Sequence, residues 1–260
     1  MTVLDRFRLD GKRLFITGGS RGLGRAMALA CAEAGADCVL VGRDAESLDL
    51  TAAEIRILGR EAFAIVADVG QPEECEAACE QALQRHGPID ILINNVGGRR
   101  QNIPIDEMPL DLWRQLIDLN LTSVVLCTKL IGGAMLKRGG GGRIINIASI
   151  NALVVGRKIA GRHYETAKAA VVQFTRATAA DWAPHGITVN AILPGGFMTE
   201  ANQRWKQIHP EVIETFLQQI PMGRYGEPEE LGPLAVYLAS DASAYMTGAS
   251  LVIDGGYTLW

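Results

Sequence analysis

Seven short apolar runs, separated by longer segments, constrain the fold of this chain more than any other feature. The runs lie near residues 14–17, 38–41, 63–67, 89–93, 143–148, 188–193 and 250–253. They are continuous and rich in Ile and Val, which is typical of parallel strands that helices cover on both faces. The sequence therefore predicts an α/β fold, in which right-handed crossovers favour a Rossmann-type, doubly wound, seven-stranded parallel sheet.

Length and composition favour one domain over the whole chain, residues 1–260. The residues are 48% apolar and 21% charged, and no long Pro- or Ser-rich linker divides them. A net charge of -4, without a basic helix that carries interleaved aromatics, argues against a nucleic-acid partner. Residues 1–10 carry charged side chains where a signal peptide would be apolar. No apolar run approaches the roughly 20 residues of a membrane span. We therefore expect a cytoplasmic protein with small-molecule partners and no membrane partner.

The placement of cysteine and histidine predicts no metal site. The five cysteines are an odd number, spread over helix-like and strand-like segments, which fits a reducing compartment better than a disulfide framework. Cys75 and Cys79 are four residues apart and could be imagined as metal ligands, but their Glu-, Ala- and Gln-rich surroundings are typical of an ordinary helix. The four histidines are scattered without zinc spacing.

Spaced glycines follow the first apolar run. Residues 17–24 read Thr-Gly-Gly-Ser-Arg-Gly-Leu-Gly and open an Ala-rich helical stretch that reaches residue 34. Backbone N–H groups at such a helix start can bind a pyrophosphate, and the missing side chains let it approach closely. Alone, this pattern also fits a simple strand-to-helix turn.

Tyr164 and Lys168 lie downstream, four residues apart, so they share one face of a helix. Bringing a phenol from its usual pKa of about 10 to neutrality requires a drop of roughly three units, or about 4 kcal/mol. A cation about 4 Å away, at an effective dielectric constant near 20, supplies roughly that much. The pair is therefore a candidate general acid and base, and beside it the glycine turn favours a dinucleotide site.

Further short segments accompany these two features in a fixed order along the chain. They are Asp68-Val69, Asn94-Asn95-Val96-Gly97, Asn120, Ser149, Asn190, Pro194-Gly195 and Asp254-Gly255-Gly256. With them the chain resembles, from end to end, the compact single-domain kind of short-chain dehydrogenase/reductase, and especially members similar to gluconate 5-dehydrogenase or 3-oxoacyl-carrier-protein reductase. Two positions depart from the family pattern. Val96 stands where Ala is usual, and Ser149 and Tyr164 are a couple of residues further apart.

The resemblance implies an enzyme that transfers a hydride reversibly between nicotinamide and a carbonyl or secondary alcohol. Tyr164 then gives or takes the proton, and Ser149 hydrogen-bonds and orients the reacting oxygen. Lys168 is implied to lower the pKa of Tyr164 and to hold the nicotinamide ribose, and Asn120 to anchor a water that links Lys168 to solvent. A nucleophilic Ser149 is disfavoured because the G-x-S-x-G sequence is absent.

The end of the second apolar run favours NADP(H) as cofactor. Gly42 stands where an NAD-preferring relative usually has an acid, and Arg43 and Arg21 can bind a 2′-phosphate through forked hydrogen bonds. Two solvated arginines with dual specificity are the alternative, so NAD(H) stays possible. The resemblance implies cofactor contacts from Gly18, Ser20, Arg21, Gly22, Leu23, Gly24, Arg43, Asp68, Val69, Asn95, Val96, Gly97, Tyr164, Lys168, Pro194, Gly195, Phe197 and Thr199.

Basic residues border the expected substrate pocket. Arg99 and Arg100 follow the fourth apolar run, and Arg157 and Arg162 lie between Ser149 and Tyr164. An anionic carbonyl compound, such as a keto acid or a sugar acid, would suit them, although surface charge or subunit contact fits equally well. His163 and Trp205 are further candidates for substrate contact.

Residues 198–221 are implied to form a lid over the substrate, and relatives imply a homotetramer. Two other functions stay open. A 3-oxoacyl thioester reductase would dock an acidic carrier on the same arginines. A non-catalytic NADP-binding sensor would have no need of Tyr164.

Overall fold

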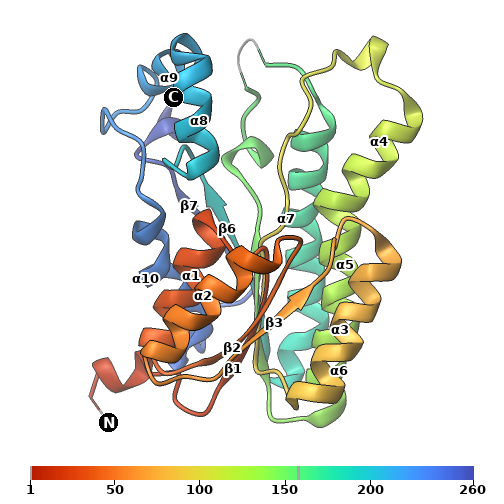
Figure 1. The fold of residues 1–260 in the computed structure, drawn as a ribbon, viewed down its shortest axis with the longest axis vertical. Coiled ribbons are helices and arrows are strands. Elements are labelled where there is room, and N and C mark those ends of the chain that lie inside the picture. The colour runs from red at the N-terminus through yellow and green to blue at the C-terminus, as the bar shows by residue number, and fades with distance from the viewer. Residues whose placement is uncertain (1, 157–158) are drawn as a thin grey trace.

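Seven parallel strands form one sheet in the computed structural model, which describes residues 2–156 and 159–260 (Figure 1). The spatial order is β3-β2-β1-β4-β5-β6-β7, and every neighbouring pair is parallel. The strands are β1 (Arg13–Thr17), β2 (Asp37–Gly42), β3 (Ala62–Val66), β4 (Ile91–Asn94), β5 (Gly142–Ile147), β6 (Ile187–Pro194) and β7 (Ser250–Ile253). The predicted seven-stranded, doubly wound fold is confirmed.

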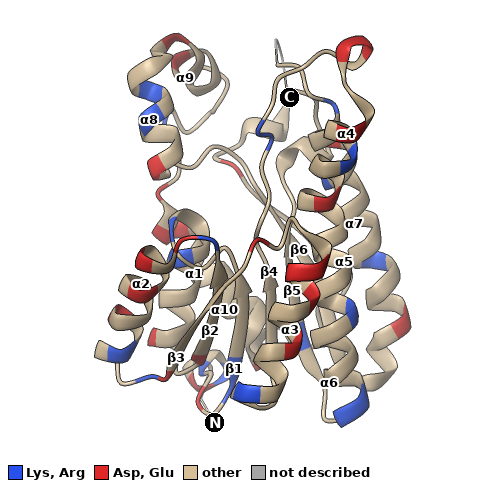
Figure 2. Ribbon diagram, turned by 45° about the vertical axis from the view of Figure 1, so that its right-hand side comes forward, with Lys and Arg blue, Asp and Glu red and all other residues tan. Residues whose placement is uncertain are grey.

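Helices cover both faces of the sheet, so the strands are apolar along their whole length. One face packs against α1 (Gly22–Glu33), α2 (Ala45–Ile57) and α10 (Gly232–Ala239). The other packs against α3 (Pro72–His86), α5 (Ser123–Cys127), α6 (Gly133–Arg138) and α7 (His163–Trp182). Figure 2 shows that basic and acidic residues are interspersed over these outer helices, in keeping with the small net charge of -4.

A long helical segment runs beside α3 and α7 and contains two π-helical turns. It consists of α4 (Leu110–Ile117), the π-turn η3 (Asp118–Thr122), α5, the π-turn η4 (Thr128–Gly132) and α6. By length and composition the stretch Leu110–Arg138 is one candidate membrane span among the described residues, which the sequence alone did not suggest. Its most apolar window is 44% buried within the protein, against α3, α7 and the sheet.

The carboxyl ends of the strands face α8 (Glu200–Ile208) and α9 (Pro210–Leu217), which follow β6 (Figure 1). Chain order reverses between β1 and β4, and ligands of open parallel sheets bind at such a reversal. Short 3₁₀ turns complete the chain: η1 (Leu4–Phe7), η2 (Ile105–Glu107), η5 (Ile150–Ala152), η6 (Ala183–His185), η7 (Pro228–Leu231), η8 (Asp241–Ser243) and η9 (Tyr257–Leu259).

The five cysteines are buried and unbridged. Cys127 of α5 meets Cys75 and Cys79 of α3, with Sγ–Sγ distances of 3.5 and 3.7 Å. The three lie in the apolar core between these helices and the sheet. A thiol that packs in this way behaves as a small apolar side chain.

Candidate active site

A pocket of about 450 Å³ opens at the carboxyl ends of the strands, where β1 and β4 diverge. The glycine turn after β1, the ends of β2 to β6 and the first turns of α7 and α8 form its walls. Most of the predicted cofactor and catalytic residues line it: Gly18, Ser20, Arg21, Gly22, Leu23, Gly24, Arg43, Asp68, Val69, Asn95, Val96, Gly97, Ser149, Tyr164, Lys168, Pro194, Gly195 and Thr199. Of the remaining two, Asn120 and Phe197 lie buried behind the lining.

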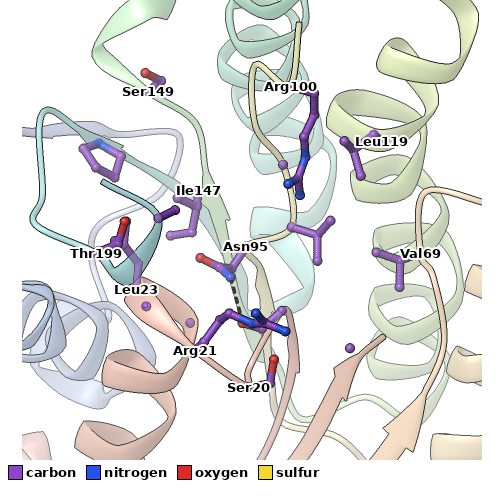
Figure 3. Close-up of a pocket in the computed structure, with 18 of the residues that line it drawn as sticks. Ser20, Arg21, Leu23, Val69, Asn95, Arg100, Leu119, Ile147, Ser149 and Thr199 are labelled. Carbon is purple, nitrogen blue, oxygen red and sulfur yellow. Dashed lines mark hydrogen bonds between the residues drawn. The ribbon is translucent and has the colours of Figure 1, made fainter. Parts of the chain in front are cut away.

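The glycine turn has the geometry to hold a pyrophosphate. Gly18 and Gly22 have φ values of 68° and 54°, and a Cβ on Gly24 would lie 2.0 Å from the Gly18 carbonyl oxygen. Asn95 Nδ2 fixes the turn by donating to the carbonyl oxygens of Thr17 and Gly18 at 3.0 and 3.3 Å (Figure 3). No side chain of the described residues caps the start of α1, so its first N–H groups stay available to an anion. The residues therefore fit a dinucleotide.

Ser149, Tyr164 and Lys168 meet at the opposite end of the pocket. Ser149 follows β5, and its Oγ accepts a hydrogen bond from the N–H of Asn151 at 3.1 Å. Lys168 Nζ donates to the Ile147 carbonyl oxygen at 2.7 Å and lies 5.9 Å from the centre of the Tyr164 ring. One turn of α7 thus places an ammonium and a phenol beside the end of β5.

Asn120 supports this end of the pocket from the first π-turn. Its Oδ1 accepts from the N–H of Gly98 at 2.8 Å, and its Nδ2 donates to the carbonyl oxygens of Gly98 and Leu116 at 3.1 and 2.9 Å. A Cβ on Gly97 would lie 2.8 Å from Lys168 Nζ and 2.9 Å from Asn120 Oδ1. A glycine at position 97 is what lets these two side chains approach the loop after β4.

Burial dominates the electrostatics of the pair. It lowers the pKa of Lys168 to about 8. The pKa of Tyr164 is raised, because burial outweighs the opposing effects of the Ser149 hydrogen bond and the Arg99 charge. The expectation of a lowered Tyr164 pKa is therefore wrong for this structure. With its pKa raised, the phenol keeps its proton at neutral pH.

Comparison with known proteins agrees with this geometry. A family model described as enoyl-(acyl carrier protein) reductase matches residues 18–258. Galactitol 2-dehydrogenase (L-tagatose-forming) of Cereibacter sphaeroides is 40% identical over 256 residues, 98% of each chain. The crystal structure of a short-chain type dehydrogenase/reductase from Mycobacterium marinum is 41% identical, with a TM-score of 0.89 over 99% of each chain. This chain belongs to the short-chain dehydrogenase/reductase family.

A second solved relative carries a cofactor. It is a putative NAD(P)-dependent gluconate 5-dehydrogenase from Beutenbergia cavernae with bound NADP. The two chains are 36% identical, and the match covers 98% of this chain and 100% of the other with a TM-score of 0.90. The predicted family and the predicted oxidoreductase activity are confirmed.

The predicted substrate arginines have partners within the dehydrogenase itself. Arg99 donates from Nη1 and Nη2 to the two Glu165 carboxylate oxygens at 3.0 and 2.9 Å, and Arg162 contacts the same carboxylate at 3.1 Å. Neither arginine lines the pocket, and Arg99 lies behind the Tyr164 ring, 5.0 Å from its centre. The sequence did not predict this arrangement, because the spacing of Tyr164 and Lys168 does not show where the Glu165 carboxylate between them points.

The remaining substrate candidates also lie away from the pocket, as far as they are described. The His163 side chain is buried, with Nε2 at 2.7 Å from the Arg99 carbonyl oxygen. Trp205 is 46% exposed and packs on His209, with ring centres 4.8 Å apart. Arg157 lies outside the described residues. The structure therefore does not place His163 or Trp205 in the pocket lining, where the sequence analysis expected them as substrate contacts.

Several lining residues escaped prediction. Leu119 precedes Asn120 and forms part of the wall, and Glu200 and Arg204 reach the pocket from one face of α8. Arg100, by contrast, was expected at the border of the pocket together with Arg99, and of these two arginines only Arg100 lines it. The four-residue spacing of Glu200 and Arg204 is a signal that could have indicated a shared face within the predicted lid.

Charged residues lie near the end of β2, at one side of the pocket. Arg43 Nη1 lies 3.5 Å from Asp68 Oδ2, and Arg21 Nη2 lies 3.4 Å from Asp44 Oδ2. All four side chains are roughly one-third to two-thirds exposed, so these ion pairs are weak and can exchange for a ligand. Gly42 between them adds no carboxylate.

Proposed function

We propose that this short-chain dehydrogenase/reductase is an NADP-dependent enzyme that interconverts a carbonyl and a secondary alcohol in a small, polyhydroxylated, anionic substrate. The observation that carries the proposal is that Ser149, Tyr164 and Lys168 converge in the same pocket as the glycine turn. When bound, the cofactor supplies or accepts the hydride.

The protein residues would handle the proton and the oxygen. Tyr164, protonated at neutral pH because of its raised pKa, donates its proton to the oxygen of the carbonyl as that oxygen becomes negative. Ser149 hydrogen-bonds the same oxygen and orients it. Lys168 is held at the Ile147 carbonyl oxygen, where its Nζ can reach a ribose hydroxyl. Asn120 would anchor the water that carries protons to Lys168.

Preference for NADP rests on the charges at the end of β2. Arg43 and Arg21 flank Gly42, and no carboxylate at that position would repel a 2′-phosphate. Charge-assisted hydrogen bonds at roughly 1.5–3 kcal/mol each would favour NADP by about tenfold to a hundredfold per arginine. The NADP in the solved relative supports this choice.

The substrate class draws on both the pocket and the relatives. Galactitol 2-dehydrogenase and the putative gluconate 5-dehydrogenase are named for polyhydroxylated substrates. Glu165 is paired with Arg99 and Arg162, whereas Arg204 lines the pocket from α8 and would meet a substrate carboxylate. An acyl-carrier-protein thioester is the second candidate, which the description of the matching family model favours.

The test follows NADPH and NADH oxidation by the purified protein with keto acids and their neutral esters, and the reverse reaction with gluconate and galactitol. We expect faster turnover with NADPH and with the carboxylates. Tyr164→Phe should lower kcat by about 10²–10⁴-fold while NADPH binding is retained. Preference for galactitol and the esters would rule out an anionic substrate. Equal turnover with NADPH and NADH would rule out the NADP preference. Full activity of Tyr164→Phe would remove the mechanism.

A further inference from the structure

Arg100 occupies a strained backbone position. Its φ is 58°, the one positive value for a non-glycine residue within residues 2–156 and 159–260. The N–H of Gln101 donates to the carbonyl oxygen of Arg99 at 2.6 Å, which closes a three-residue γ-turn with Arg100 at its centre. A γ-turn of this positive-φ kind is rare and strained, and such strain clusters at ligand sites.

The turn directs the Arg100 side chain into the cofactor pocket. Figure 3 shows it entering the hollow from the loop after β4, between Asn95 and Leu119 and on the opposite side from Arg21. The side chain folds back over Gly98, where an added Cβ would lie 3.4 Å from Arg100 Nε. Gly98 has a φ of 156° and leaves room for the stem, so the two residues together aim the guanidinium.

The charge of Arg100 is not compensated as its neighbours are. Arg43 is paired with Asp68, and Arg21 with Asp44. Within the described part of the chain, Arg100 forms no ion pair. Burial lowers its pKa, the nearby charges of Arg43 and Arg21 act in the same direction, and Asp68 acts in the opposite one. The positive charges of Arg43 and Arg21 thus act on Arg100 across the pocket, and an anion would relieve this repulsion.

We propose that Arg100 is a ligand for a phosphate of the dinucleotide. A guanidinium binds phosphate oxygens through parallel, charge-assisted hydrogen bonds. Two phosphates of the dinucleotide are candidates for this contact. Assignment to the 2′-phosphate rests on the NADP preference proposed above, whereas assignment to the pyrophosphate does not.

Calorimetric titration of the full-length protein with 2′,5′-ADP, 5′-AMP and adenosine separates these sources. Arg100→Gln should weaken a phosphate-bearing ligand by about tenfold to a hundredfold and leave adenosine unchanged. A loss confined to 2′,5′-ADP assigns the 2′-phosphate, and a loss for 5′-AMP as well assigns the phosphate on the 5′ side. Equal loss for adenosine, or no loss at all, would overturn the proposal. Gln101→Ala, an exposed neighbour outside the pocket lining, is the matched control and should bind like the unmodified protein.

A second variant tests whether the backbone strain at Arg100 serves ligand binding and not the stability of the fold. Arg100→Gly permits the positive φ without a Cβ, so Tm should rise by about 2–4 °C while phosphate affinity falls as in Arg100→Gln. A fall in Tm would show that the arginine stabilises the fold and would overturn the assignment of strain to a ligand site. The NADPH-to-NADH ratio of the unmodified protein and of Arg43→Ala tests the cofactor preference separately, so the two proposals can fail independently.

Discussion

Lys168 is an ammonium with almost no contact with solvent. The residue is 2% exposed, and its Nζ donates to the Ile147 carbonyl oxygen. Burial brings its pKa down from 10.5 to about 8, so the folded chain releases this proton earlier than the unfolded chain does. The buried lysine therefore costs stability in full below about pH 8, where both states carry the proton, and this cost disappears as the pH rises to about 10.5.

This cost predicts a pH dependence of folding. Between pH 8 and about pH 10.5 the unfolded chain binds the proton more strongly, so stability rises with pH across that window and this contribution is flat below it. Compared with Lys168→Met, the unmodified protein should gain about 3 kcal/mol over the window. Urea unfolding of both proteins at pH 7.5, 8.5 and 9.5 measures the difference. Parallel curves would contradict the lowered pKa.

Arg99 and Glu165 form a largely buried ion pair beside Tyr164. Their side chains are 17% and 11% exposed, and Arg99 also donates to the carbonyl oxygens of Ala160 and Gly161. Arg99→Met should lower the free energy of unfolding by about 2–4 kcal/mol, because it leaves a buried carboxylate with Arg162 alone. Arg99→Met/Glu165→Leu should recover most of the loss, as measured by urea unfolding. If the double variant is as unstable as the single one, the carboxylate is not the cause.

At this scale the sequence predicted residues whose place depends on short patterns. The glycine turn, Asn95, Ser149, Tyr164 and Lys168 follow strands or share one helical turn, and the structure brings them to one pocket. Arg99 and Arg162 were placed near substrate because a sequence does not show that the carboxylate of Glu165 turns toward both. Arg100 was expected near the substrate with Arg99, but its turn toward the cofactor residues was not predicted, because a γ-turn with positive φ has no glycine to signal it.

At the scale of elements, the helical segment from Leu110 to Arg138 differs most from expectation. Its two π-turns each insert an extra residue, and π-turns are frequent at functional sites. The first turn carries Asn120, whose amide reaches Gly98 as well as Leu116. The helical segment therefore continues through the first π-turn while the Asn120 side chain supports the loop at Gly98.

The second π-turn ends at a pair of glycines with different surroundings. A Cβ on Gly132 would lie 2.6 Å from Trp182 Cζ3 and 2.9 Å from Ile144 Cδ1, whereas nothing lies within 4 Å of one on Gly133. Gly132→Ala should destabilise the fold by about 1–3 kcal/mol through overpacking. Gly133→Ala, the matched control, should stabilise it by about 0.5–1 kcal/mol through helix propensity. Thermal unfolding measures the change in stability of each variant. A change of the same sign in both variants would contradict the overpacking at Gly132.

The sequence predicted strands more closely than helix irregularities. All seven strands lie within about two residues of their apolar runs, because a continuous Ile- and Val-rich run has no alternative place in a covered sheet. Pro72 marks the start of α3 as proline often does. The π-turns have no such signal, since they arise from packing of the segment against α3, α7 and the sheet.

At the scale of the whole molecule, one edge of the sheet and the chain terminus suggest contact between subunits. Within the described ranges β7 pairs with β6 alone, and Val252 on it is 41% exposed. Leu259 and Trp260 are 75% and 83% exposed. An unpaired edge beside exposed apolar side chains is typical of a protein interface.

We therefore expect a homotetramer of the 28.0 kDa chain. Analytical ultracentrifugation should give four times the chain mass, and Val252→Arg should give a smaller species because a charge cannot be buried at that edge. Ile57→Arg, at an 84% exposed apolar position at the end of α2, should leave the mass unchanged. A monomer at micromolar concentration would rule out the tetramer.

Two consecutive arginines of the loop after β4 point in different directions. Arg99 contacts Glu165 of α7, whereas Arg100 enters the cofactor pocket. One tight turn sets that division, so inserting or deleting a single residue there would swap or misdirect both side chains. Natural variation in this loop should then preserve its length even where the residues change. Anyone transplanting the pocket into another scaffold would have to copy the spacing of the arginine pair as well as the pair itself.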